Sequence, residues 1–480
     1  MTGHPLSRRI ADVLTLQPDA PAIEFDGRWI SWGQIGTAAR RVGSSLRGTD
    51  VGMLLRNRPA HVAALLGVLM SGATVVTINP SRGDERTRAD IAELRLPLVL
   101  GEPDDLTTLV NGKLSTATVS LDGIFDGPGG RPEVARQCSD VAVRMLTSGT
   151  TGPPKRIDLS YDTLAHSVIG ADYRTAPLPG EVRRGVAIVN SPLVHIGGVF
   201  RVLQCVVAAR PFVLLERFEL TSWAAAVRKH RPRTVSLVPA ALRTVLHSGL
   251  TRHDLAGIRT VTCGTAPLSA DDADAFTAKY GIPVLTSYAA TEFGGGVAGW
   301  TLPDHQRYWA AKRGSVGRVN PGAQLRVVDD AGSVVGPDQV GRLEVKPAQH
   351  GSARWMQTTD LARIDADGFV WIVGRADQAI IRGGFKVMPD DVRNALESHP
   401  AVAGAAVIAR ADARLGETPV AVVELRAPAT TDELVTHLRK RLARYEIPSE
   451  IVVVDDIPRT PSGKTDLGAV REFFQRDHAR

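Results

Sequence analysis

The chain of 480 residues is 43% hydrophobic and 22% charged, the composition of a globular protein with a buried core. Its length exceeds what one ordinary core supports, so we expect at least two domains. The net charge of +6 comes without a run of basic residues or a ladder of basic and aromatic residues, so we expect no nucleic-acid partner.

The cysteines and the apolar segments indicate the cellular compartment of the protein. Cys138, Cys205 and Cys263 lie far apart and form no CxxC pair, which is typical of a reducing compartment without disulfides or a metal cluster. The longest apolar stretch, 61–78, is interrupted by a Ser-Gly pair, and it predicts a buried helix feeding a buried strand rather than a membrane span. The first residues show no apolar signal core. We therefore expect a cytoplasmic protein with no transmembrane segment, as a monomer or a homodimer.

Strand-like and helix-like segments alternate over most of the chain. A hairpin is expected at 22–32, with its turn at Asp26-Gly27, and a helix at 32–46. The short apolar runs that we interpret as strands stand at 51–55, 74–78, 96–100, 141–146, 186–189, 212–215, 235–238, 258–263 and 284–285. This alternation predicts an α/β fold of doubly wound, mostly parallel sheets with helices on both faces. Shorter segments at 315–373, separated by turns, predict a small β region.

The last hundred residues have the pattern of a separate module. A helix is expected to start at Pro389, with two acidic residues in its first turn. The segments expected here are a helix at 389–397, strands at 402–409 and 420–425, a helix at 432–443 and a strand at 451–454. We expect an N-terminal domain of residues 1–374, a hinge at 375–377 and a small mobile α+β domain of residues 378–480.

One loop has the composition of a phosphate-binding site. Residues 147–155 read TSGTTGPPK and follow the β-like run 141–146. Glycines let a backbone approach a ligand closely, and hydroxyls, amides and a lysine suit the phosphates of a nucleotide. A mobile surface loop is the alternative for such a sequence taken alone. The loop is not a Walker A motif, because the chain's one Gly-Lys-Thr, 463–465, has Pro458 where that motif needs a glycine.

Five motifs together resemble one known superfamily. They are the TSGTTGPPK loop, Tyr288-Ala-Ala-Thr-Glu292, Thr359-Asp360, residues 374–378 with 382–387, and PRTPSGK at 458–464. Their residues and order are similar to those of the adenylate-forming superfamily, which includes acyl-CoA synthetases, luciferases and the adenylation domains of peptide synthetases. The chain looks most like bacterial acyl-CoA synthetases of the fatty-acid–CoA ligase type, which would place it in fatty-acid and lipid metabolism.

The resemblance implies a two-step reaction with ATP, Mg²⁺ and coenzyme A. A carboxylic acid would react with ATP to give an acyl-adenylate and pyrophosphate, and coenzyme A would then take the acyl group. Catalytic roles are implied for Lys464, Thr291 and Glu292, and Glu292 and Thr151 would hold Mg²⁺, which prefers oxygen ligands. The implied ATP-binding residues are Thr147, Ser148, Gly149, Thr150, Thr151, Gly152, Lys155, Gly264, Thr265, Ala266, Tyr288, Asp360 and Arg375.

The same resemblance implies an acyl pocket, a coenzyme A path and a hinge. The implied acyl pocket is formed by His195, Val238, Cys263, Ala289 and Ala290; the coenzyme A path by Gly383, Gly384 and Lys386; and the hinge by Asp377. The small and apolar walls favour an acyl chain or a bulky ring, such as a lipid- or sterol-derived acid, over a polar amino acid.

Three positions depart from the family pattern, and two other functions stay open. Arg156, Thr265 and Ala289 stand where the family has smaller residues, which predicts a changed loop or a narrower pocket rather than lost chemistry. One alternative is an acyl-AMP ligase that loads an acyl carrier protein in place of coenzyme A. The other is a nucleotide-binding relative that has lost catalysis.

Overall fold

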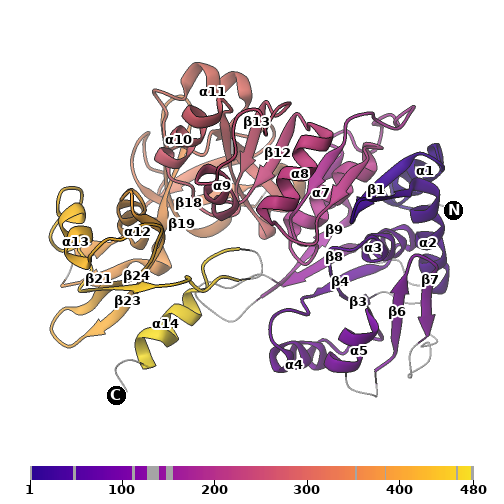
Figure 1. The fold of residues 1–480 in the computed structure, drawn as a ribbon, viewed down its shortest axis with the longest axis horizontal. Coiled ribbons are helices and arrows are strands. Elements are labelled where there is room, and N and C mark those ends of the chain that lie inside the picture. The colour runs from indigo at the N-terminus through magenta and orange to yellow at the C-terminus, as the bar shows by residue number, and fades with distance from the viewer. Residues whose placement is uncertain are drawn as a thin grey trace.

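In the computed structural model, the residues described are 3–46, 50–110, 114–126, 140–146, 155–351, 354–383, 385–460 and 463–476. Figure 1 shows the N-terminal elements at one end of the long axis and β21, β23, β24, α12 and α13 at the other. The predicted mixed α/β architecture with mostly parallel sheets is confirmed. In the described part of the chain, no helix combines the length and apolarity that a membrane crossing requires.

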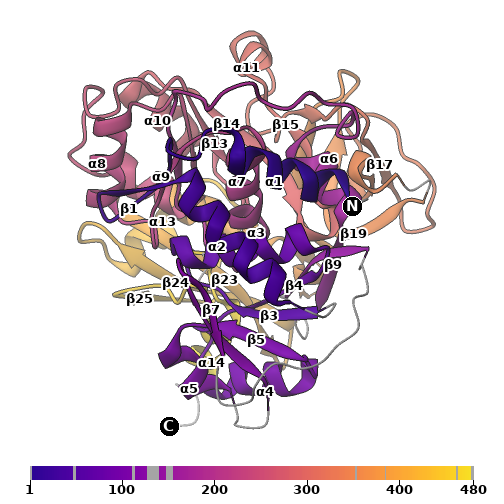
Figure 2. The same ribbon diagram turned by 90° about the vertical axis from the view of Figure 1, so that its right-hand side faces the viewer.

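A seven-stranded sheet carries the first part of the chain. Its order is β7-β6-β5-β3-β4-β8-β9, parallel except at its two ends. Its strands are β3 (Asp50–Leu54), β4 (Thr74–Ile78), β5 (Leu98–Gly101), β6 (Thr116–Ser120), β7 (Gly123–Asp126), β8 (Val141–Leu146) and β9 (Arg156–Ser160). The helices here are α1 (Pro5–Leu16), α2 (Trp32–Ser45), α3 (Pro59–Ser71), α4 (Asp84–Leu94), α5 (Pro103–Leu109) and α6 (Tyr161–Val168). Figure 2 shows α1, α2 and α3 grouped beside one another.

The apolar stretch 61–78 has the predicted form. Its first part lies in α3, whose residues are almost all buried, and its second part is the fully buried strand β4. Gly72 ends the helix in the left-handed region, at φ 77°, where its N–H bonds back to the last turn. The stretch therefore forms the centre of the largest hydrophobic core.

Two further sheets continue the α/β pattern. The first has the order β10-β11-β1-β2 and the second the order β12-β13-β14-β15-β16. Their strands are β1 (Pro21–Phe25), β2 (Arg28–Ser31), β10 (Ala187–Val189), β11 (Phe212–Leu214), β12 (Thr234–Leu237), β13 (Thr260–Cys263), β14 (Val284–Ala290), β15 (Gly295–Gly299) and β16 (Arg318–Val319). The accompanying helices are α7 (Ile196–Val207), α8 (Leu220–His230), α9 (Pro239–Leu246), α10 (Ala270–Tyr280) and α11 (Leu302–Tyr308).

The small β region is an antiparallel sheet of the order β17-β18-β19-β20. Its strands are β17 (Gln324–Val328), β18 (Gly341–Lys346), β19 (Met356–Ile364) and β20 (Val370–Arg375). Three short 3₁₀ helices stand nearby in the chain: η1 (Thr291–Phe293), η2 (Ala348–His350) and η3 (Ala376–Gln378). The last of these follows β20 directly, at the position of the predicted hinge.

The C-terminal region, residues 378–480, is built on the sheet β22-β21-β24-β23, with β25 paired to β24. Its strands are β21 (Ile380–Arg382), β22 (Phe385–Val387), β23 (Val402–Asp412), β24 (Gly416–Leu425) and β25 (Glu450–Val454), and its helices α12 (Pro389–Glu397), α13 (Thr431–Arg439) and α14 (Leu467–Arg476). It has its own hydrophobic core.

Three of the differences from the sequence prediction have a local explanation. The helix α13 ends at Arg439 rather than at 443, because the Ala443 N–H bonds the carboxylate of Glu446, 2.7 Å away, outside the helix. Strand β14 continues past 285 to Ala290, since β15 pairs with it antiparallel. Helix α14 was not predicted, although Val470 and Phe474, four residues apart, bury one of its faces.

Candidate active site

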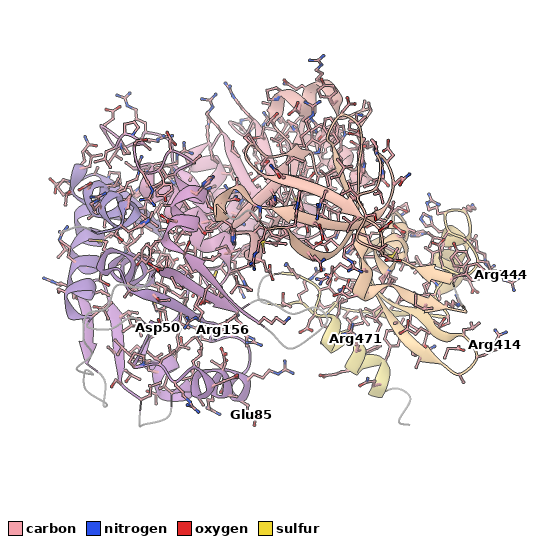
Figure 3. The ribbon with its side chains drawn as sticks, turned by 180° about the vertical axis from the view of Figure 1, so that it is seen from behind. Asp50, Glu85, Arg156, Arg414, Arg444 and Arg471 are labelled. Carbon is pink, nitrogen blue, oxygen red and sulfur yellow. The ribbon has the colours of Figure 1, made fainter. Side chains whose placement is uncertain are left out.

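The phosphate loop lies mostly outside the described residues. This applies to the predicted residues Thr147, Ser148, Gly149, Thr150, Thr151 and Gly152, and so to the metal role of Thr151. Lys155 is exposed at the start of β9. The next residue, Arg156, has its guanidinium 2.6 Å from Asp90 of α4 and 3.1 Å from the carbonyl oxygen of Thr77, and Figure 3 labels it on the sheet. Arg156 is thus a member of the strand and ties this end of the loop to α4.

Thr291 and Glu292 form a short turn directly after β14. This turn is the 3₁₀ helix η1, closed by Gly294 at φ 69°. Phe293, the next residue, is buried in a hydrophobic cluster and anchors the turn. A Cβ on Gly294 would lie 2.3 Å from Thr163, so only glycine fits there. The half-buried Thr291 and Glu292 are therefore held at the carboxyl end of a parallel strand, where ligands bind in α/β sheets.

Tyr288 on β14 meets Asp360 and Arg375, which stand on the paired strands β19 and β20 of another sheet. The Tyr288 hydroxyl donates a hydrogen bond to the Asp360 carboxylate, and Asp360 on β19 stands opposite Arg375 on β20. Burial raises the pKa of Asp360, while Tyr288 and Arg375 act to lower it. Burial and the Asp360 carboxylate raise the pKa of Tyr288. The structure thus unites three of the predicted nucleotide-binding residues in one group.

Arg375 also contacts the residue predicted as the hinge. Its guanidinium donates two hydrogen bonds of 3.0 Å to the Asp377 carboxylate and one of 2.5 Å to the Thr359 hydroxyl. Gly374, just before it, adopts φ 150°, and a Cβ there would lie 2.5 Å from Met388 of the C-terminal region. The chain is therefore closely packed where it enters that region.

Lys464 reaches this site from the C-terminal region. Residues 458–466 fold back on themselves: the Thr460 N–H bonds the Lys464 carbonyl at 2.7 Å, Arg459 bridges Thr465, and Gly463 turns at φ 79°. Burial lowers the pKa of Lys464, Glu292 acts to raise it, and Arg375 acts to lower it further. The ammonium group therefore lies within electrostatic reach of residues from both η1 and β20.

His195, at the N-cap of α7, also lies within electrostatic reach of Lys464. Burial, together with the Lys464 charge, lowers the pKa of His195 to about 4, so its ring is neutral at pH 7. Its Nε2 atom is buried without a hydrogen-bond partner among the residues described. A neutral ring with a free nitrogen suits a wall that contacts substrate rather than a cationic binding group.

A pocket between the two regions opens beside Lys464. It is lined by Val238, Pro239, Ala240, Arg243, Thr265, Ala266, Pro267, Arg393, Arg459, Gly463, Lys464 and Thr465. The predicted residues Val238, Thr265 and Ala266 thus face Lys464 across this pocket. Thr265 has φ 73°, a left-handed backbone that costs a β-branched residue strain of about 1–3 kcal/mol. The departure from the family pattern at this position therefore carries an energetic cost.

The other predicted pocket residues differ in their surroundings. Ala289 is exposed and Ala290 half-buried on β14, next to η1. Cys263, in contrast, is 2% exposed in the second hydrophobic core, and burial raises the pKa of its thiol to about 12. Its side chain supports the sheet behind the site instead of facing a ligand. The following residue, Gly264, is half-buried, and a Cβ there would lie 3.0 Å from the Ser287 hydroxyl.

The residues predicted for coenzyme A lie on the β21–β22 hairpin. Gly383 turns at φ 57°, and its N–H bonds the Leu415 carbonyl at 2.7 Å. Gly384 and the side chain of Lys386 are outside the described residues. The hairpin belongs to the C-terminal sheet, whereas Lys464 lies in the loop between β25 and α14.

Sequence reasoning missed several charged groups around the site. Arg243 on α9 is bound by Asp272, at 2.7 Å, and by Glu397 of the C-terminal region, at 2.6 Å. Arg201 lies inside the otherwise apolar helix α7. A charged residue within an apolar helix is a signal that could have identified Arg201, whereas the partners of Arg243 are too distant in sequence to infer. In the described residues, no cluster of side chains has the composition of a dedicated metal centre.

Taken together, the fold and site define a nucleotide-binding α/β protein whose site residues follow the carboxyl ends of strands. The model of the AMP-binding enzyme family matches residues 10–351, and that of the AMP-binding enzyme C-terminal domain matches residues 391–464. The chain therefore belongs to the AMP-binding enzymes, which confirms the predicted superfamily.

Curated relatives match nearly the whole chain. A feruloyl-CoA synthase from Amycolatopsis sp is 29% identical, over 96% of this chain and 97% of the relative. The 4-coumarate–CoA ligase-like 8 of Arabidopsis thaliana is also 29% identical, over 92% and 86%. Among solved structures, ATP-bound MatB from Rhodopseudomonas palustris is 25% identical over 97% of this chain and 98% of that one, with a TM-score of 0.80.

Proposed function

We propose that the chain is an ATP-dependent acid–thiol ligase. It joins a carboxylic acid to ATP, forming an acyl-adenylate and releasing pyrophosphate, and then transfers the acyl group to the thiol of coenzyme A. The observation that carries the proposal is the position of Lys464, a half-buried cation presented by the C-terminal region within electrostatic reach of Glu292, Arg375 and His195. The relatives named as coenzyme A ligases support the same activity.

The first step must bring two anions together, and the site supplies the charge that this requires. The carboxylate and the α-phosphate repel one another, and a fixed cation in a buried site lowers that barrier far more than one in water. We assign this role to Lys464, with Thr291 donating to the α-phosphate. Asp360 accepts from the ribose hydroxyls, Tyr288 packs beside the base, and Arg375 holds the ribose edge.

Glu292 fits a magnesium ion, and a solved relative is described in complex with ATP and magnesium. Its half-buried carboxylate stands at the end of β14, in the electrostatic range of Lys464. Magnesium prefers carboxylate and phosphate oxygens, so this residue would hold it. When bound, the ion neutralises charge on the phosphates and on the leaving pyrophosphate.

The second step requires the thiol to reach the adenylate, which Lys464 now covers. We assign residues 1–374 and 378–480 to two domains that rotate about Asp377, with Gly383, Gly384 and Lys386 approaching the site after rotation. The 3₁₀ helix η3, which joins β20 to the C-terminal sheet at Asp377, supports this assignment.

The names of the relatives favour a carboxylic acid substrate that contains a ring. Several are named for aromatic acids, including an indoleacetate–CoA ligase from Aromatoleum aromaticum, 27% identical. The fatty-acid and lipid roles suggested by the sequence find no support among these relatives. We therefore propose an aromatic or ring-bearing acid as the substrate class.

The test is acid-dependent pyrophosphate release from MgATP, with and without coenzyme A. We expect turnover with coenzyme A, and a loss of at least about 100-fold in the adenylation rate for Lys464→Ala, since one aimed electrostatic group is worth that much. A matched control is Lys229→Ala, which removes an equal charge from a lysine paired with Glu24. Release that stalls near one turnover despite coenzyme A would instead favour a carrier-protein acceptor. No release with any acid would favour a relative without catalysis.

A further inference from the structure

A single charged side chain interrupts the apolar helix α7. Its sequence, IGGVFRVLQCVV, contains Arg201 and no other charged residue. Val199, Val202 and Leu203 around it are buried in the main core. The less buried residues of the helix follow a helical spacing and so share one face: they are Ile196, Gly197, Phe200, Arg201 and Gln204.

This face of α7 looks onto the sheet that carries the nucleotide site. The Arg201 guanidinium donates a hydrogen bond of 3.1 Å from Nη2 to the hydroxyl of Thr262 on β13. Along β13, Val261 and Cys263 point into the core behind the sheet, so Thr262 and Gly264 point to the other side. Arg201 is therefore on the same side of the sheet as Gly264, about 7 Å along the strand from it.

This face begins directly after His195, the N-cap of α7, which lies within electrostatic reach of Lys464. Gly197 lies between His195 and Arg201, and a Cβ placed on it would meet no atom of the described residues within 4 Å. Space is therefore open along α7 between the catalytic end and Arg201. From His195 to Arg201 the helix advances by about 9 Å, a distance that a short carbon chain or one ring can span.

Among the described residues, the half-buried Arg201 has no carboxylate partner. A guanidinium carries five N–H donors, and the hydrogen bond found for Arg201 goes to a neutral hydroxyl. In the described part of the chain, no carboxylate forms an ion pair with it, and burial lowers its pKa. Cys205, one turn further on, is a neutral thiol, because burial raises its pKa to about 12. By contrast, the buried Arg243 is neutralised by two carboxylates.

An unneutralised, desolvated cation facing an open space fits an anionic ligand. Buried charges persist in proteins when a partner compensates them, and a planar guanidinium matches a carboxylate in two parallel hydrogen bonds. We propose that Arg201 binds a second carboxylate of the substrate, so that the acid activated here is a dicarboxylic acid. This inference rests on the proposed function. Lys464 serves the reacting carboxylate, and Arg201 fixes the distant one.

Matched pairs of acids test the proposal. Coenzyme A-dependent pyrophosphate release is measured with 4-carboxycinnamate against cinnamate, and with adipate against hexanoate. We expect kcat/KM to favour the dicarboxylate by at least about 100-fold, since a site built for a polar group strongly rejects the analogue without it. Arg201→Met should abolish that preference, while Arg201→Lys should keep part of it. Arg217→Met, which removes the same charge from an exposed residue, should leave it unchanged.

A binding measurement separates the failure of this inference from that of the proposed function. Calorimetry with stable acyl-sulfamate analogues of the two cinnamoyl-adenylates needs no turnover. Tighter binding of the carboxylated analogue that is lost in Arg201→Met supports the inference even if no activity is found. Equal binding of both analogues by the wild type, or an equal loss of both in Arg201→Met, overturns it even where monocarboxylic acids are activated.

Discussion

The nucleotide side of the site and the contact with the C-terminal region are held by different interactions. On the proposed nucleotide side, Asp360 and Arg375 stand opposite one another on the paired strands β19 and β20, so the backbone ladder sets their relative positions, and the Tyr288 hydroxyl reaches Asp360 from β14 of the neighbouring sheet. At the contact, side chains join the two regions: Arg243 binds Glu397, and a guanidinium nitrogen of Arg426 lies 2.5 Å from Nε2 of His247. Groups fixed by strands stay in place, whereas side-chain pairs can part and re-form. The proposed departure of Lys464 from the site in the second step requires contacts of this second kind.

The largest effect is expected on the fixed side. Asp360→Ala removes a buried acceptor for the ribose and leaves the Tyr288 hydroxyl unpaired, so KM for ATP should rise by about 10- to 100-fold. Asp360→Asn, which keeps one acceptor oxygen, should cost less. Steady-state kinetics in ATP at saturating acid would show this, and an unchanged KM in Asp360→Ala would remove Asp360 from the nucleotide site.

A smaller effect is expected at the contact. Glu397→Gln weakens the link to Arg243, which keeps Asp272, and so should slow adenylation by about 10-fold while leaving thioester formation from pre-formed adenylate unchanged. Single-turnover assays of the two half-reactions measure this. The matched control is Glu450→Gln, which breaks an ion pair with Arg410 inside the C-terminal region. Equal slowing of both half-reactions would mean that the pair stabilises the fold instead of one arrangement.

The smallest effect is a shift in the pH profile that reports how fully Lys464 is buried. Burial lowers the pKa of Lys464 below the 10.5 of a free lysine. As pH rises, Lys464 therefore loses its charge earlier than a free lysine would. The alkaline limb of kcat/KM for ATP should therefore fall below pH 10.5, and it should move up in Lys464→Arg. In Glu397→Gln the limb should move toward 10.5, because Lys464 spends less time in the site. An alkaline limb that is unchanged in both variants would report the titration of a group other than Lys464.

The strand pattern could be predicted from the sequence because burial leaves a local signature. The hairpin at 22–32 and the pair of α3 and β4 are examples. The order of the motifs was equally informative about the family. Helix α14 could have been predicted as well, because Leu467, Val470 and Phe474 recur at the i, i+3, i+7 spacing of one helix face.

The contacts within the site could not be read from the sequence. Tyr288 and Asp360 are 72 residues apart, and Arg243 and Glu397 are 154 apart. Their meeting depends on the order of strands in the sheets and on how the C-terminal region docks, and local periodicity specifies neither. For the same reason Cys263 was assigned to the acyl pocket, although its place in the strand turns it into the core.

The ion pair between Arg156 and Asp90 couples the stability of β9 to that of α4. Both side chains are largely shielded, at 15% and 16% exposed, so replacing either one alone leaves a charge without its partner. Arg156 and Asp90 are therefore expected to behave as one unit: the double replacement Arg156→Ala/Asp90→Ala should destabilise the protein by less than the sum of the two single replacements.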